Sequence, residues 1–445
     1  MPSASPSVAR PFACAVFEPG DPGYAAEVAA FHPNIVHSPE IVVGAGSATD
    51  VAAAIDIARE QGLRVAVQGG RHGTAPATSG LLITTHHMNQ VAVDAGTRVA
   101  TIGGGALWSD VIAVAAPHGL MPITGSTSHV GAVGYLLGGG VSILGRSHGY
   151  SSDHVLGFTV VTAAGEVVEA SATSHPDLFW ALRGGKSGLG VVTEARVRLH
   201  ALPTLYAGSI AIEEAHIEPA LRGWLDWTQG ADDLVTTSAA IIDFPEMELV
   251  PPPFRGKRLL FLRFAYPGDE ARGAELAAPL RELAPIFLDD LGLIPSSQMD
   301  RIHNDPTEPI PFWGSGAQLT HADQEFATRW LDRFGSGAHH PFAVVEIRHG
   351  GSAQAVDVPE GSAVTGRSAN YTLFLAAMFP PLFAEAAPAA AAEAMDAFRP
   401  WVLPEVNVNF IEGNTVARPW SPETQARLDE VRRRYDPEGV FTLRW

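Results

Sequence analysis

The sequence predicts an α+β protein built from two structural units, and three observations lead to this expectation. The chain has 445 residues, which is more than one compact domain usually holds. From about residue 40 to residue 200, short strands, helices and glycine-rich turns alternate. After Pro203 the pattern changes to long helical stretches between apolar strands, which is typical of a sheet covered by helices on one face.

The first unit is predicted from alternating apolar residues and from signals at helix ends. Ser47 and Asp50 form a capping-box pattern, and Gly62 stands where the helix that they begin would end. A second helix is expected at 110–116, and the turns 94–97 and 163–165 each indicate a hairpin. Strands are expected at 41–43, 63–67, 81–84, 91–93, 99–102, 158–162 and 167–169.

The second unit is predicted from longer elements. Helices are expected at 218–227, 270–283, 322–334 and 388–398. Strands are expected between them at 207–212, 238–242, 258–265, 343–348 and 371–376. Prolines at 251–253 and at 306, 309 and 311 indicate surface loops. From Pro404 the pattern changes again, and a charged helix is expected at 422–435.

Composition excludes several classes of partner. Lys and Arg number 29 against 48 Asp and Glu, which gives a net charge of −19. Such a surface repels nucleic acid and anionic lipid, so neither is an expected partner. The single cysteine, Cys14, excludes an internal disulfide framework. The start lacks a secretory pattern and prolines interrupt the most apolar stretch, 373–391, so we expect a cytoplasmic protein.

Glycine is concentrated in three segments, 68–73, 124–127 and 131–140. Because glycine lacks a Cβ atom, successive backbone N–H groups in such turns can approach one diphosphate. The run from Val42 to Gly46 also ends a strand and opens a helix, as a dinucleotide-binding motif would. Its third glycine is missing, since position 49 is Thr, so we do not expect a nicotinamide cofactor there.

These segments, in this order, resemble the FAD-linked oxidases of the vanillyl-alcohol oxidase superfamily, in the berberine-bridge-enzyme-like branch. The blocks that carry the resemblance are 68–73, 125–140, 153–165, 177–193, 346–351, 407–410 and 434–441. The resemblance implies a two-lobed PCMH-type FAD-binding domain at 1–202, with a core at about 34–202. It also implies a separate domain of antiparallel sheet plus helices at 203–403, which binds the substrate, and a C-terminal segment, 404–445, that returns to the FAD domain.

The resemblance implies FAD held covalently through His72 alone, because His72 matches the histidine that bonds the 8-methyl carbon of the flavin. Thr127 stands where some members attach a cysteine, and Cys14 lies far away in the chain. Arg71 replaces the usual glycine, and it either pairs with the diphosphate or distorts the turn and leaves FAD non-covalent. The expected cofactor-binding residues are Gln68, Gly69, Gly70, Arg71, His72, Gly73, Thr124, Gly125, Ser126, Thr127, Val130, Gly131, Gly134, Tyr135, Gly138, Gly190, Val191, Val192 and Asn409.

The catalytic residues are less clear from the sequence. Tyr135 matches a position that donates a hydrogen bond to the N1–C2=O edge of the flavin, and the alternative is a packed core tyrosine. Phe410 stands where many relatives carry a catalytic tyrosine. Glu346 and Arg348 share one face of a predicted strand, so Glu346 is our candidate base and Arg348 its partner. An ordinary surface ion pair is the alternative for this pair.

Tyr371 and His349 are reserve candidates for catalysis. A metal site is not expected. The pairs at 86–87 and 339–340 are adjacent histidines, whose side chains point in different directions, and no helix carries His at i and i+4 with an acidic partner.

The expected function is an oxidase that takes hydride from an alcohol, amine or activated C–H bond of a small natural product, sugar or aromatic compound. The small residue Ala132 follows the Val-Gly pair at which relatives control oxygen access, which favours O2 as the electron acceptor. Two alternatives remain open: a non-redox cyclase or rearrangement catalyst that uses FAD as a scaffold, and a binding protein without cofactor. The chain is expected to be a monomer or a homodimer.

Overall fold

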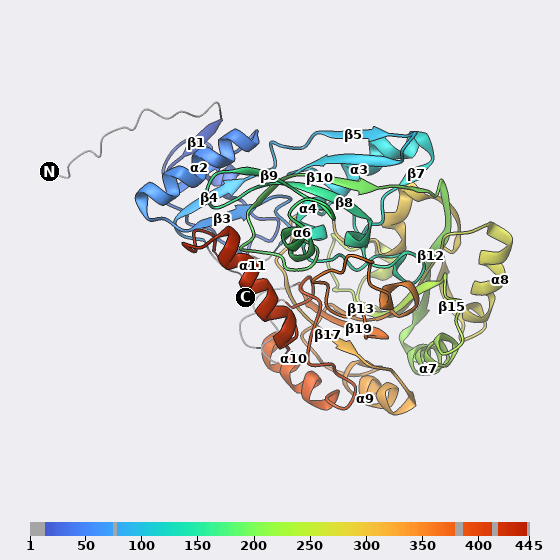
Figure 1. Ribbon diagram of the computed structural model, residues 1–445. Helices are drawn as coiled ribbons and strands as arrows, with labels where there is room; N and C mark the ends of the chain where they lie inside the picture. The colour runs from blue at the N-terminus through green and yellow to red at the C-terminus, as the bar shows by residue number, and fades with distance from the viewer. Residues whose placement is uncertain (1–13, 74–77, 379–385, 412–416, 443–445) are drawn as a thin grey trace.

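The computed structural model describes residues 14–73, 78–378, 386–411 and 417–442, and Figure 1 shows their arrangement. A small sheet near the N-terminus has the strand order β1-β2-β4-β3, in which β2, β4 and β3 are parallel. Its strands are β1 (Ala15–Phe17), β2 (Ile41–Gly44), β4 (Leu81–Thr84) and β3 (Val65–Gln68). Two helices belong to it, α1 (Tyr24–Val28) and α2 (Ala48–Gln61).

The ends of α2 follow the sequence signals. Ser47 caps its N-terminus and accepts a hydrogen bond from the Asp50 backbone N–H at 3.2 Å. Gly62 ends it at φ 68°, in the left-handed region where glycine carries no steric penalty. Between these ends, α2 buries Val51, Ile55 and other apolar residues against the small sheet. The capped, one-sided helix therefore fixes the sheet whose carboxyl edge carries the first glycine-rich turn.

A second, antiparallel sheet follows, with the order β5-β6-β10-β8-β9. Its strands are β5 (Val91–Asp94), β6 (Val99–Gly103), β10 (Val191–Arg198), β8 (Val155–Val161) and β9 (Val167–Ala170). The helices of this part are α3 (Trp108–Ala115), α4 (Ala132–Leu137), α5 (Gly145–His148) and α6 (Pro176–Leu182). A two-stranded ribbon of β7 (Leu120–Met121) and β11 (His200–Ala201) leads to the last sheet.

The last sheet is antiparallel and has eight strands in the order β15-β12-β14-β13-β18-β19-β17, with β16 paired to β12. They are β12 (Thr204–Glu213), β13 (Thr236–Asp243), β14 (Arg258–Tyr266), β15 (Ile286–Asp289), β16 (Gly292–Pro295), β17 (Trp313–Leu319), β18 (Val344–His349) and β19 (Tyr371–Ala377). Four helices pack on one face of it, as Figure 1 shows: α7 (Ile217–Thr228), α8 (Glu270–Arg281), α9 (Gln324–Phe334) and α10 (Ala386–Ala397).

The C-terminal segment returns to the small sheet. Val65 of β3 donates its N–H to the Val440 carbonyl at 2.9 Å and accepts from the Thr442 N–H at 2.8 Å. Helix α11 (Pro422–Tyr435) packs against α6, and Arg432 donates to the Gly185 carbonyl at 3.0 Å. The boundaries 202/203 and 403/404 stay predictions, although the chain does pass from β11 to β12 between residues 201 and 204.

The α+β prediction is confirmed, although several elements were not predicted, among them the strands β10, β15, β16 and β17. Strand β17 is absent from the sequence interpretation because Gly314 and Gly316 interrupt its apolar pattern. A Cβ atom on Gly316 would lie 2.8 Å from the Phe410 side chain, so the glycine permits close packing. The prolines at 306, 309 and 311 do lie in a surface loop, and Asp305, Pro306 and Ile310 of this loop also line a cavity. No helix in the described part of the chain combines the length and apolarity needed to cross a membrane.

Candidate cofactor and substrate site

A cavity of about 1260 Å³ is lined by residues of the small sheet, the five-stranded sheet, the eight-stranded sheet and the C-terminal segment. Most of the residues predicted to bind the cofactor line it together: Gln68, Gly69, Gly70, Arg71, His72, Gly73, Gly125, Ser126, Thr127, Val130, Gly131, Gly134, Tyr135, Gly190, Val191, Val192 and Asn409. Thr124 and Gly138 are not among the lining residues. Thr124 is fully buried, with its hydroxyl 3.6 Å from Met299 Sδ. Gly138 packs behind the wall, where a Cβ atom would overlap the Asn409 side chain.

Two glycine turns meet backbone to backbone at one wall of this cavity. A Cβ atom on Gly70 would lie 2.4 Å from the backbone of Gly131, and one on Gly131 would lie 2.7 Å from Gly70 N. Neither position therefore tolerates a side chain without movement of the main chain. This contact brings the first and third predicted glycine segments to the same place.

His72 lies at the cavity wall between aromatic neighbours. Its ring stacks on Phe31 at 4.0 Å, and His32 approaches edge-on at 5.3 Å. Its Nε2 atom is buried and has no hydrogen-bond partner in the part of the chain that the structure describes. Burial, together with the nearby His32 and His129, lowers the pKa of His72 to about 4, so the imidazole is neutral near pH 7. A neutral imidazole is the nucleophilic form that a covalent link requires.

Arg71 adopts φ 62°, the left-handed conformation that glycine would take without strain. Its Nη2 atom lies 3.2 Å from Nε2 of His86, and its carbonyl accepts from the Phe31 N–H at 3.0 Å. The turn thus keeps the shape that a glycine would give it, and the backbone of Arg71 is strained as a result.

Tyr135 is fixed by the backbone around it. Its hydroxyl donates to the Val141 carbonyl at 2.6 Å, and burial raises the pKa of the phenol above its usual value. The hydroxyl hydrogen is therefore committed to the protein rather than to a ligand. Beside it, Asn409 donates to the Tyr135 carbonyl at 3.2 Å and accepts from Lys186 Nζ at 3.0 Å. Lys186 also lines the cavity, and sequence reasoning did not select it.

The antiparallel sheet presents a buried ionic network to the cavity. Glu346 accepts from Arg263 Nη1 at 2.6 Å, from Ser238 at 2.7 Å and from Arg348 Nε at 2.7 Å. Burial alone would raise the pKa of Glu346, but the charges of Arg348 and Arg263 outweigh it and hold the pKa well below its usual value. Glu346 and Arg348 do share the cavity face, as the period of two predicted. A carboxylate held this firmly in its ionised form is a poor proton acceptor, so Glu346 does not suit the role of base.

His303 lies next to this network and was missed by sequence reasoning. Its Nε2 is 3.4 Å from Oε1 of Glu346, its side chain is 7% exposed, and it lines the cavity. Burial and the charge of Arg263 lower the pKa of His303, so its imidazole is neutral near pH 7. No motif marks His303 in the sequence, because it stands in an irregular proline-rich segment and meets Glu346 only through the fold.

Tyr371 and His349 lie outside the cavity. The Tyr371 hydroxyl is 2.7 Å from Thr228 Oγ1, on α7, and accepts from Gln229 at 3.1 Å. His349 stacks on the Tyr371 ring at 5.0 Å. His349 directly follows Arg348 on β18, so the two side chains face opposite sides of the sheet. Tyr371 pairs with His349 on the neighbouring strand, so neither reserve candidate lies beside Arg348 in the cavity.

The far end of the cavity is aromatic and aliphatic. The centre of the Phe244 ring lies 5.3 Å from that of Phe254, in a tilted arrangement, and 6.1 Å from that of Phe261, edge to face. Leu249 lines the same end while 69% exposed, which places this end next to solvent. Asp243, which also lines it, is bound by both Arg258 Nε at 2.5 Å and Arg258 Nη2 at 2.7 Å. This end therefore offers a ligand mainly apolar contacts.

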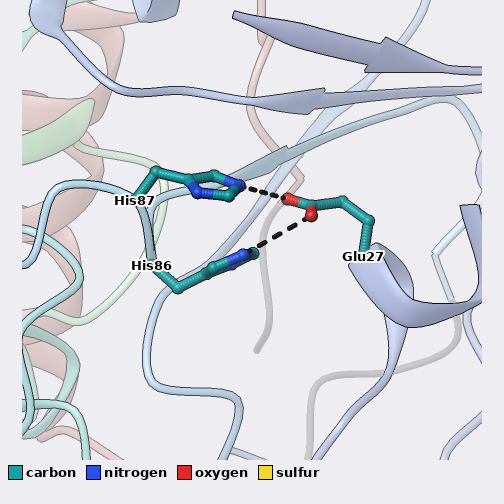
Figure 2. Close-up of side chains that lie close together, drawn as sticks. All are labelled: Glu27, His86 and His87. Carbon is teal, nitrogen blue, oxygen red and sulfur yellow. Dashed lines mark ion pairs between the residues drawn. The ribbon is translucent and has the colours of Figure 1, made fainter. Parts of the chain in front are cut away.

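Three further expectations can be placed. Thr127 lines the cavity, whereas Cys14 lies on the small sheet, where burial and Asp50 raise its pKa to about 11. Ala132 is fully buried and is not one of the lining residues, and its part in oxygen access stays a prediction. The premise about adjacent histidines is wrong for one pair: His86 and His87 both turn toward Glu27, as Figure 2 shows.

Comparison with known proteins agrees with this geometry. Residues 39–171 match the family model described as FAD binding domain. Over 231 residues the chain is 33% identical to (R)-6-hydroxynicotine oxidase of Paenarthrobacter nicotinovorans, which covers 51% of this chain and 47% of that protein. The aligned part thus spans about half the length of this relative.

Solved structures extend the likeness to nearly the whole chain. The crystal structure of 6-hydroxy-D-nicotine oxidase from Arthrobacter nicotinovorans superposes with a TM-score of 0.84 at 26% identity, covering 98% of each chain. BBE-like 1 of Physcomitrella patens gives 0.83 at 17% identity, covering 97% of this chain and 96% of that one. Glucooligosaccharide oxidase of Acremonium strictum, described with a 6-S-cysteinyl, 8α-N1-histidyl FAD, gives 0.81 at 19% identity, with coverage of 97% and 96%. The last two show the fold alone.

The matched domain and the fold together define a chain with a PCMH-type FAD-binding domain. The chain is similar to FAD-linked oxidoreductases of the vanillyl-alcohol oxidase superfamily, in agreement with the resemblance of the glycine-rich blocks.

The residues present fit FAD on structural grounds. At the contact between Gly70 and Gly131 the cavity wall is backbone without side chains. His72 follows Gly70 by two residues, and its Nε2 has no hydrogen-bond partner among the described residues. Backbone N–H groups and Lys186 are suitable partners for a diphosphate and for the electron-rich edge of a flavin.

Proposed function

We propose that this protein is an FAD-dependent oxidase that takes hydride from an alcohol or amine of a small, largely apolar substrate and passes the electrons to O2. The observation that carries the proposal is the buried Nε2 of the neutral His72 imidazole, which has no hydrogen-bond partner among the described residues, at the wall of a cavity of about 1260 Å³. Bound FAD would supply the hydride acceptor. Covalent attachment through His72 alone is part of the proposal, because Cys14 lies away from the cavity.

His303 is the proton acceptor in this proposal. It is neutral, it lines the cavity, and it lies beside the ionic network of Glu346, Arg263 and Arg348. Glu346, held by Arg263 and Arg348, orients these groups and does not take the proton. An alcohol substrate must lose its hydroxyl proton as hydride leaves, and a neutral imidazole within reach can accept it.

The aromatic end of the cavity supports an apolar substrate more than a sugar. Phe244, Phe254 and Phe261 contribute rings there, and the charges of Asp243 and Glu346 are already paired within the protein. A sugar brings many hydroxyls, each of which needs a polar partner when buried. A flat molecule with one alcohol or amine matches such walls better.

The cofactor part of the proposal is tested by the mass of the denatured protein. The expected result is a chain that carries the added mass of FAD, and a His72→Ala variant that does not. His129→Ala is the matched control, because it removes another histidine near His72 and is expected to keep the added mass. A parent chain that releases all its flavin on denaturation would contradict the covalent link.

The redox part is tested by anaerobic addition of (R)-6-hydroxynicotine, with xylobiose as the sugar comparison. A redox enzyme bleaches the flavin band, near roughly 450 nm for flavins in general, and air then restores the band with release of hydrogen peroxide. His303→Gln is expected to slow the bleaching by about 10²–10⁴-fold. A band that stays unchanged with every alcohol and amine tested, while the compounds are still converted, would favour the non-redox cyclase or rearrangement alternative.

A further inference from the structure

Outside the cavity, one cluster of side chains has no role in the proposed oxidase. Glu27 on α1 faces His86 and His87, which follow β4 directly (Figure 2). His86 Nε2 lies 3.4 Å from one carboxylate oxygen of Glu27, and His87 Nε2 lies 3.4 Å from the other. The three ligand atoms all lie within 4.8 Å of one another. We propose that Glu27, His86 and His87 form a binding site for a divalent transition-metal ion of the zinc type.

The fold places these residues where a parallel sheet usually binds ligands. The histidines stand at the carboxyl edge of β4, between the parallel strands β2 and β3. Gly44 ends β2 at the same edge, and a Cβ atom there would lie 3.0 Å from both Glu27 Oε1 and His87 Nε2. The run from Val42 to Gly46, which resembles part of a dinucleotide motif, therefore has another use: its first glycine makes room for this cluster.

The distances suit a metal better than direct hydrogen bonds. An N–H···O hydrogen bond usually measures about 2.7–3.2 Å, shorter than either 3.4 Å contact. Two donors that each lie about 2.0–2.1 Å from a tetrahedral zinc ion are separated by about 3.3–3.4 Å. Each contact thus has the length of one ligand–ligand edge around zinc, and the two contacts end on different oxygens of the same carboxylate.

Two neighbouring features complete the surroundings of the cluster. Arg71 Nη2 lies 3.2 Å from Nε2 of His86, and because a guanidinium only donates, that nitrogen acts as an acceptor. Glu27 is 7% exposed, so its carboxylate is largely removed from bulk water.

The cluster has both an anchored side and an open side. Thr84 donates to Oε1 of Glu27, which fixes the carboxylate. The side chain of His87 is 45% exposed, so an ion can reach the cluster from solvent. Two imidazoles and one carboxylate, with a position left for water, form a donor set that zinc accepts. The nearby Arg71 guanidinium would be repelled by the ion, and it can turn toward the cavity that it lines.

Zinc binding to the purified full-length protein tests the proposal independently of the oxidase function. After treatment with a chelator, the protein is titrated with ZnCl2 by calorimetry and its zinc content is measured after gel filtration. The expected result is one equivalent of zinc, and Co²⁺ in its place is expected to give the visible absorption of a tetrahedral site. His86→Ala and His87→Ala are expected to weaken binding by at least about 10–100-fold.

Two variants serve as matched controls. His339→Ala removes an exposed histidine from the other His-His pair and is expected to leave zinc affinity unchanged. Arg71→Ala removes a nearby positive charge but no ligand, so it is expected to bind zinc at least as tightly as the parent. Glu27 is buried, so Glu27→Gln risks misfolding, and the exposed His87 decides the matter. Stoichiometric binding that survives His87→Ala, or no binding by the parent, would overturn the proposal.

Discussion

Arg348 Nε lies 2.7 Å from Oε2 of Glu346, two residues earlier on the same strand and on the same face of it. Arg263 binds the other carboxylate oxygen at 2.6 Å from the neighbouring part of the sheet. The carboxylate is only 1% exposed, so its charge is balanced by the two guanidinium groups rather than by water. This arrangement places a fixed ionic network of Glu346, Arg348 and Arg263 at the cavity wall.

Glu346→Gln is expected to lower the free energy of unfolding by about 3–5 kcal/mol, because it leaves two buried arginines without their counter-charge. Urea unfolding of the flavin-loaded protein measures this. Asp396→Asn is the matched control, since Asp396 pairs with Arg399 at the exposed surface and such pairs contribute about 0–1 kcal/mol. Equal effects of the two substitutions would contradict the claim that Glu346 balances the charges of Arg263 and Arg348.

Gly131→Ala is expected to abolish retention of flavin. Gly131 has φ −61°, which any residue adopts, so the substitution tests the contact with Gly70 and not backbone strain. The ratio of flavin to protein absorbance after purification gives the result. Gly230→Ala, at a position where a Cβ atom meets nothing within 4 Å, is expected to stay fully yellow.

Arg71→Gly is expected to be more stable than Arg71→Ala by about 1 kcal/mol, because only glycine takes φ 62° without penalty. Both variants lose the guanidinium, so the comparison isolates the backbone conformation. Thermal unfolding at one pH measures the difference. An alanine variant that equals or exceeds the glycine variant would mean that Arg71 is not strained.

Tyr371→Phe is expected to leave the rate of flavin reduction unchanged and to lower stability by about 1 kcal/mol. The lost hydroxyl contacts Thr228 and Gln229, behind the sheet and away from the cavity. Stopped-flow reduction and urea unfolding on the same preparations separate the two effects. A large fall in the reduction rate would return Tyr371 to the list of catalytic candidates.

Stability is expected to fall as the pH drops from about 6.5 toward 4. Burial and neighbouring histidines lower the pKa of His200 to about 3 and of His148 to about 4, while unfolded histidines titrate near 6.5. Within that window the unfolded state binds more protons, so protonation favours unfolding. Unfolding at pH 7, 6 and 5 measures the slope, and His200→Gln is expected to make it shallower. Stability that rises on acidification would contradict these directions.

Local patterns in the sequence predicted most of the elements and most of the cofactor wall. The capped helix after Ser47 and the strand 81–84 depend on signals within a few residues, and both form where expected. The glycine turns were predictable for the same reason, since the lack of a Cβ atom at Gly70 and Gly131 is itself the functional property.

The ionic network around Glu346 was predictable only in part, because its chemistry depends on partners far apart in the chain. The face shared by Glu346 and Arg348 follows from strand period. The loss of basicity of Glu346 follows from Arg263, 83 positions away, and no local pattern carries that information. His303, from an irregular segment, and the convergence of His86 and His87 on Glu27 also depend on tertiary contacts.

The hydrogen bonds that join Val65 to Val440 and Thr442 have a consequence for biosynthesis. Phe441 is part of the cavity wall, so a nascent chain lacks that wall until residue 441 has left the ribosome. Flavin loading is therefore expected only after that point. A ribosome-bound chain that stops shortly before residue 440 is expected to stay colourless during prolonged incubation with FAD.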